Sequence, residues 1–161
     1  MSRLVYYTAT TLDGFIADPD DSLDWLLRQP QDSDTDDDAF GYDAFIKDVG
    51  AIVMGSATYE WVFDHRDEVV AEVGREWPYD MPAWVMTSRH LATVASADIR
   101  FASGDVREVY ADMTDAAGEK DLWMVGGGDL AGQFAEAGLL DEIVVSIAPV
   151  TLGSGKPLLP R

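Results

Sequence analysis

The stretch Trp123-Met124-Val125-Gly126-Gly127-Gly128-Asp129-Leu130 runs from an apolar strand through three consecutive glycines into an amphipathic helix. Glycine has no Cβ atom, so the backbone at this turn can approach a ligand closely. The first N–H groups of a helix have no partner inside the helix and carry partial positive charge, which favours a bound phosphate. The stretch therefore predicts a phosphate-binding turn, and a dinucleotide cofactor is its natural ligand.

Two familiar phosphate-binding motifs fit this chain poorly. Gly126-x-Gly128-x-x-Ala131 matches the dinucleotide fingerprint, but no carboxylate follows about 20 residues later, where the ribose ligand is expected. The motif also lies late in the chain, which disfavours an ordinary Rossmann domain. The run Gly153-Ser154-Gly155-Lys156 resembles part of a P-loop, yet Val150 and Pro157 occupy the positions of its first glycine and its Ser or Thr.

Composition limits the possible partners. The 161 residues suit a single domain over residues 1–161, which buries roughly two thirds of its unfolded surface. The formal net charge of −19 disfavours nucleic acids and anionic membranes, and it requires specific donors for any anionic cofactor. There is no cysteine and no membrane-length apolar run, and the first residues suit a strand better than a signal peptide. We therefore expect a cytoplasmic protein.

The order of expected elements predicts an α/β fold with a central, mostly parallel sheet flanked by helices. The expected strands cover residues 3–10, 50–55, 83–87, 99–102, 122–125 and 142–148. The expected helices cover residues 39–47, 56–63, 105–116 and 130–137, with a short helical patch around Trp25.

A metal site is not expected. The acidic run Asp32-x-Asp34-x-Asp36 matches the first ligands of an EF-hand loop, but Asp37 stands where the sharp turn needs glycine. Asp43 falls at the twelfth position, where glutamate is expected. We interpret the run as a solvated acidic loop.

Three segments, in the right order, resemble the dihydrofolate reductase-like superfamily: TATTLDGFIA at residues 8–17, GAIVMGSATY at 50–59 and LWMVGGGDL at 122–130. Within it the chain is most similar to the C-terminal reductase domain of the bifunctional riboflavin-biosynthesis deaminase-reductase and to its stand-alone bacterial relatives. The pair Asp13-Gly14, the run SLDW at 22–25 and the run APVTLGSG at 148–155 carry that resemblance. It covers nearly the whole chain.

The resemblance implies an NADPH-dependent reductase that passes hydride to a pteridine-like or aminopyrimidine-like molecule. The implied neighbours of the nicotinamide carboxamide are Ala9, Ile16 and Ala17. The implied phosphate ligands are Gly55, Ser56 and Thr58, and those of the adenosine and its 2′-phosphate are Thr87, Ser88 and Arg89. The residues implied to pack over the pyrophosphate are those of the glycine turn and the helix start, Val125, Gly126, Gly127, Gly128, Asp129 and Leu130. We expect Gly126 and Gly127 to leave no room for a side chain.

Simpler interpretations of some of these residues remain open. The glycines could serve only the turn, Thr58 could cap a helix, and Arg89 could be a surface base. Ser56 replaces a base that relatives commonly carry, so NADH is also possible. Asp129 suits the helix dipole but competes with a phosphate. The chain stops where the family usually adds a β-hairpin, so either a final hairpin is missing or a partner covers the edge.

Hydride transfer needs little from the protein beyond positioning of the rings, exclusion of water and a proton donor. The candidate catalytic acids are Asp13 and Asp43, with Asp24 as a third candidate. Asp13 could equally be a turn residue. Asp24 and Trp25 are the candidate substrate-binding residues, although Trp25 could be a packing lid.

Two other functions remain possible: a true dihydrofolate reductase, or a non-catalytic nucleotide-binding or interaction module on the same fold. We also expect a homodimer. The apolar strand at residues 142–148 has no following hairpin to cover it, and an exposed apolar edge favours pairing.

Overall fold

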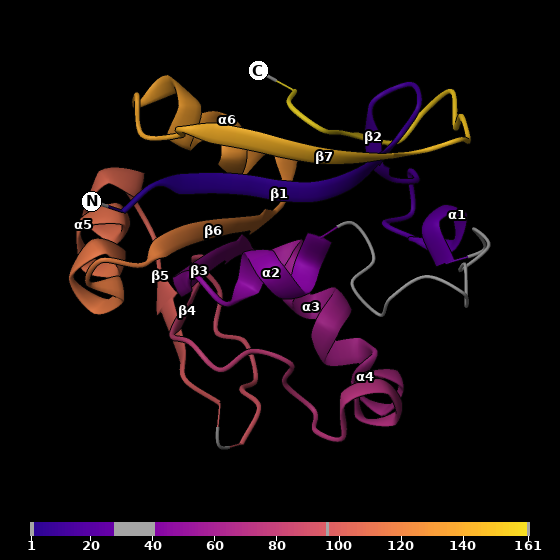
Figure 1. Ribbon diagram of the computed structural model, residues 1–161. Helices are drawn as coiled ribbons and strands as arrows, with labels where there is room; N and C mark the ends of the chain where they lie inside the picture. Colours follow the sequence, from indigo (N-terminus) through magenta and orange to yellow (C-terminus); the bar gives the residue numbers. More distant parts are fainter. Residues whose placement is uncertain (1, 28–40, 96, 161) are drawn as a thin grey trace.

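A computed structural model describes residues 2–27, 41–95 and 97–160. Its centre is a six-stranded sheet in the order β5-β4-β3-β6-β1-β7, and all five strand pairs are parallel (Figure 1). The strands are β1 (Leu4–Thr11), β3 (Val49–Gly55), β4 (Ala83–Met86), β5 (Ile99–Ala102), β6 (Asp121–Gly126) and β7 (Glu142–Ala148). The expected α/β fold with a central parallel sheet is confirmed.

Helices cover both faces of this sheet. On one face, α5 (Val106–Ala117) and α6 (Gly128–Glu136) pack on buried side chains such as Leu4 and Val53. On the other, α2 (Tyr42–Ile46) and α3 (Ser56–Asp64) pack on side chains such as Ile52 and Val85. Because both faces are covered, the inner strands β3 and β4 are continuous apolar runs rather than alternating ones.

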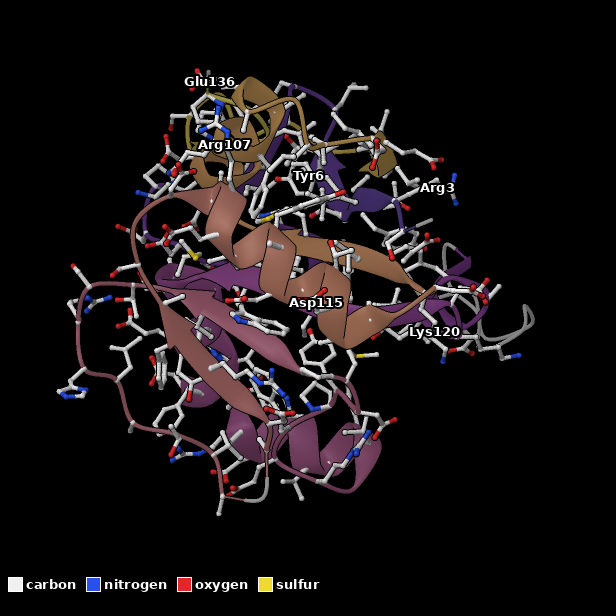
Figure 2. The ribbon with its side chains drawn as sticks, turned by 90° about the vertical axis from the view of Figure 1, so that its left-hand side faces the viewer. Arg3, Tyr6, Arg107, Asp115, Lys120 and Glu136 are labelled. Atoms are coloured by element: carbon white, nitrogen blue, oxygen red, sulfur yellow. The ribbon has the colours of Figure 1, made fainter. Side chains whose placement is uncertain are left out.

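The view in Figure 2 shows α5 lying across the sheet. Tyr6, labelled there, is fully buried in the core beneath α5 and α6, and its hydroxyl donates to the carbonyl of Leu158 at 3.1 Å. At the amino-terminal edge of the sheet, Arg3 pairs with Asp121 at 3.5 Å and Glu142 at 2.9 Å. These contacts join the starts of β1, β6 and β7.

A second, two-stranded sheet pairs β2 (Phe15–Ala17) with β8 (Lys156–Pro157) in antiparallel orientation. The backbone N–H of Leu158 extends this contact by donating to the carbonyl of Gly14 at 2.9 Å. The C-terminal segment, yellow in Figure 1, therefore returns to the turn that follows β1. The sequence did not predict this sheet, since each of its strands is too short for a periodicity.

Most of the expected elements are present with shifted ends. The short patch around Trp25 is α1 (Asp24–Leu27), and the expected helix at residues 39–47 is seen as α2. A further helix, α4 (Arg66–Val73), follows α3 and was not predicted. The EF-hand-like acidic run at 32–37 lies outside the described residues, and among those that are described no cluster suited to a metal ion is found.

Candidate functional site

Three neighbouring strands end together at one edge of the sheet. Gly55 at the end of β3 is in register with Met86 at the end of β4, and Met54 is in register with Gly126 at the end of β6. Parallel sheets bind their ligands at this carboxyl edge. These pairings place the ends of β3, β4 and β6 on one rim of the sheet.

A cavity of about 540 Å³ opens at this edge. It lies between the β2–β8 sheet and the starts of α3 and α6. Its lining includes these residues of the predicted cofactor set: Ile16, Ala17, Gly55, Ser56, Thr58, Gly127, Gly128, Asp129 and Leu130. The other predicted cofactor residues lie outside this lining: Ala9, Thr87, Ser88, Arg89, Val125 and Gly126.

The three glycines differ in the space around them. A Cβ atom on Gly126 would lie 2.9 Å from Thr58 Oγ1, and one on Gly128 would collide with the carbonyl oxygens of Pro157 and Leu158. A Cβ atom on Gly127 would meet nothing closer than Ile16 Cδ1, at 4.0 Å. The expectation of no room at Gly127 is therefore wrong: that residue faces open cavity, and Gly128 is crowded instead. The Gly126–Gly127 peptide bond is cis.

The starts of α3 and α6 are open to the cavity. Their N-cap residues are Gly55 and Gly127, and among the described residues no side chain caps either helix. Thr58, on the first turn of α3, lines the cavity, and the N-cap residue of that helix is Gly55, so the interpretation of Thr58 as a helix cap is not supported. Asp129 lies on the first turn of α6, where its carboxylate accepts from Gln133 Nε2 at 3.0 Å.

The charges around the cavity differ from the sequence-based expectation. Arg89, the predicted base, lies outside the lining and pairs with Glu60 of α3 at 2.8 Å. Lys156 of β8 lines the cavity and was missed. Its signal was present in the run at 153–156, which was set aside because it failed as a P-loop.

A second cavity, of about 360 Å³, adjoins the first and shares with it Asp21, Leu23, Ala57 and Trp61. Asp24, a predicted substrate-binding residue, lines this second cavity.

Two other residues predicted for substrate or catalysis line neither cavity. Trp25 is buried with 7% of its surface exposed, which agrees better with the packing role. Asp43 is exposed on α2. The structure thus brings only Asp24 of this group to a cavity.

The hydrogen bonds around Asp13 suit a residue that stabilises a turn rather than one that donates a proton. Its carboxylate accepts from Thr11 Oγ1 at 2.6 Å and from the backbone N–H groups of Leu152 and Gly153 at 3.2 and 2.8 Å. The hydrogen bond from Thr11 and that from Gly153 lower the pKa of Asp13. A carboxylate held ionised by donors has no proton to give at neutral pH, so the catalytic interpretation of Asp13 is not supported and the turn interpretation is.

An aromatic cluster that the sequence did not reveal packs α2 on the sheet. The ring of Tyr7 stacks on Phe45, with centroids 4.3 Å apart and planes 10° apart, and Trp123 meets both edge-on. Trp123 Nε1 donates to the carbonyl of Tyr7 at 3.0 Å. Burial, helped by the charge of Asp43, raises the pKa of Tyr42 beside them.

The fold is that of a dihydrofolate reductase-like α/β domain. A dihydrofolate reductase from Enterococcus faecalis, solved with NADP(H) and RAB-propyl, is similar with a TM-score of 0.60 at 17% identity, over 97% of this chain and 76% of that one. The chain belongs to the RibD C-terminal domain family, whose model matches residues 3–161.

Two other proteins are similar to this chain in sequence as well, at 30% and 31% identity. A putative riboflavin biosynthesis protein from a Shewanella species has a TM-score of 0.73 and 30% identity, over 100% of this chain and 84% of that one. YwjB of Bacillus subtilis is 31% identical over 157 residues, which is 97% of this chain and 82% of YwjB. Separately, no helix among the described residues has the length and apolarity to cross a membrane.

Proposed function

We propose that this protein is an NADPH-dependent reductase that binds its cofactor in the 540 Å³ cavity. Membership of the RibD C-terminal domain family supports a reductase, and the NADP(H) complex of a similarly folded dihydrofolate reductase supports a nicotinamide cofactor. The observation that carries the proposal is the open face of Gly127. A ligand can reach this backbone between two helix starts that no side chain caps among the described residues.

The lining fits a dinucleotide. The first N–H groups of α3 and α6 and the hydroxyl of Thr58 are donors suited to phosphate oxygens. Ile16 and Leu130 are apolar lining residues suited to exclude water from a nicotinamide ring. We retain Thr87, Ser88 and Arg89 for the adenosine end, because they follow β4 at the same edge of the sheet. When bound, the cofactor supplies the hydride.

The second cavity supports a separate place for the substrate. Asp24 lines it next to the shared residue Leu23, and the buried ring of Trp25 anchors the short helix that carries Asp24. We propose Asp24 as a substrate-binding residue and Trp25 as its support. Asp24 and Asp43 remain the candidate proton donors, and Asp24 is favoured because it lines one of the two cavities described above, whereas Asp43 lines neither.

The substrate we propose is a pteridine-like or aminopyrimidine-like small molecule, and the proposal includes a cytoplasmic homodimer. The test mixes the protein with NADPH or NADH and a panel of pterins and aminouracils, and follows the loss of reduced nicotinamide. Oxidation that requires both protein and substrate is expected. Turnover of dihydrofolate alone would indicate a true dihydrofolate reductase, and cofactor binding without any turnover would indicate a non-catalytic nucleotide-binding module.

A further inference from the structure

Lys156 lines the 540 Å³ cavity of a chain whose formal net charge is −19. Three charged side chains line the 540 Å³ cavity within the described part of the protein: Asp21, Asp129 and Lys156. Lys156 is the only base among them. An anionic ligand in this cavity therefore meets two carboxylates and one ammonium group.

The backbone of Lys156 is held firmly against the cavity wall. In the β2–β8 sheet it is in register with Ala17, which also lines the cavity. Gly155, the residue before it, has φ 150°, and a Cβ atom there would collide with the carbonyl oxygen of Ala17. Only glycine allows β8 to approach β2 this closely.

The position of Lys156 also relates it to the glycine turn. The next residues, Pro157 and Leu158, present their carbonyl groups to Gly128 at the start of α6, where a Cβ atom would collide with both. Lys156 thus belongs to the segment that packs against the predicted pyrophosphate turn. Arg89, by contrast, lies beyond β4 and outside the cavity lining.

The ion pair of Lys156 does little for the fold. Its Nζ lies 3.9 Å from Asp21 Oδ1, and the two side chains are 51% and 56% exposed. Such a long and exposed pair contributes little to stability. A phosphate offers shorter, charge-assisted hydrogen bonds to the same ammonium group.

The loop that carries Asp21 is well defined. The Asp18 carboxylate accepts from the N–H groups of Asp20 and Ser22, both at 2.8 Å, and Asp21 itself has φ 63°. The backbone of Asp21 is therefore held at the cavity wall, within reach of Lys156, so that its carboxylate can compete with a ligand for that base.

We propose that Lys156 is the cation that binds the pyrophosphate of the nucleotide, and that Asp21 competes for it. This inference rests on the proposed function. Because NADPH and NADH share the pyrophosphate, Lys156 contributes equally to both and leaves the choice between them to other residues.

The test measures equilibrium binding of NADPH and NADH to purified variants. Lys156→Met should weaken both cofactors about tenfold, as expected for one lost hydrogen bond to a charged group. Asp21→Asn should strengthen both about threefold, by removal of one exposed competing charge. In the double variant the gain from Asp21→Asn should disappear, and Lys156→Arg should bind within about threefold of wild type.

Lys120→Met is the matched control, since it removes the same charge just before β6, at the opposite edge of the sheet. Equal binding by Lys156→Met and Lys120→Met would overturn the inference, as would a loss confined to NADPH. If wild-type protein binds neither cofactor, the proposed function fails as well. If wild type binds both and Lys156→Met is unaffected, only the role of Lys156 fails.

Discussion

The Asp13 carboxylate accepts a hydrogen bond from the backbone N–H of Gly153 at 2.8 Å, which ties the turn after β1 to a loop 140 positions later. Thr11 and Leu152 donate to the same carboxylate. These donors hold the β1–β2 turn and the segment leading to β8 together. The strands that follow these two segments, β2 and β8, contribute residues to the 540 Å³ cavity, so Asp13 helps to position the site although it does not line the cavity.

Asp13→Asn should therefore lower the melting temperature at neutral pH. The folded pKa is below the unfolded value, so the stabilisation is complete above an unfolded pKa of about 3.9. It is lost as the pH falls through the lower, folded pKa, and the difference between wild type and variant should shrink there. Thermal denaturation from neutral to acidic pH measures this. An unchanged melting temperature at neutral pH, with a lost turnover, would restore the catalytic interpretation.

Gly127→Ala should weaken NADPH binding more than tenfold, or by over about 1.4 kcal/mol. The folded protein leaves space for the methyl group, which would stand in the cavity where the ligand approaches the backbone. Fluorescence titration measures the affinity, and thermal denaturation shows that the variant is folded. An unchanged affinity in a folded variant would indicate that the glycines serve only to form the turn.

Gly128→Ala should behave differently, with a loss of stability of about 1–3 kcal/mol. Its methyl group would collide with the carbonyl groups of Pro157 and Leu158 and displace the C-terminal segment. Chemical denaturation measures the free energy of unfolding. Wild-type stability would show that the contact between α6 and this segment is looser than the structure indicates.

Arg89→Ala should weaken NADPH more than NADH, by about 1 kcal/mol, because its guanidinium is exposed and screened. The matched variant Glu60→Gln frees Arg89 from its 2.8 Å ion pair and should shift preference toward NADPH. Affinities of each variant for the two cofactors decide this. Equal losses for both cofactors in Arg89→Ala would assign Arg89 to another role.

The exposed edge of β7 should form a dimer contact. Ile143 and Ile147 on this strand are 41% and 60% exposed, and β7 pairs only with β1 among the described strands. Ile147→Lys and Val145→Lys should give monomers at micromolar concentration, whereas Val70→Lys, at a comparably exposed apolar residue of α4, should not. Sedimentation measures this, and a monomeric wild type would contradict it.

The sequence predicted the sheet well because buried parallel strands are long apolar runs that end at glycine or polar residues. The edge strands β5 and β7 are more exposed, and their predicted bounds also match the structure to the residue. The β2–β8 pair escaped prediction, because two or three residues carry no periodicity and their pairing spans most of the chain.

The sequence predicted the glycines of the site, but it did not predict which basic side chain lines the cavity. Gly55 and Gly127 lie where a local strand–turn–helix pattern puts them. Lys156 reaches the cavity only through the long-range β2–β8 contact, and Arg89 is turned to Glu60 of α3 by a tertiary ion pair. Neither contact is encoded in the spacing of nearby residues.

Titration of the wild-type protein and of Gly127→Ala with NADPH tests the nucleotide site most directly. We expect saturable binding of one cofactor per chain by wild type, and binding weakened more than tenfold, or over about 1.4 kcal/mol, in the folded variant. The absence of saturable binding by wild type, or equal affinity in the two proteins, would contradict the assignment of this cavity to the cofactor.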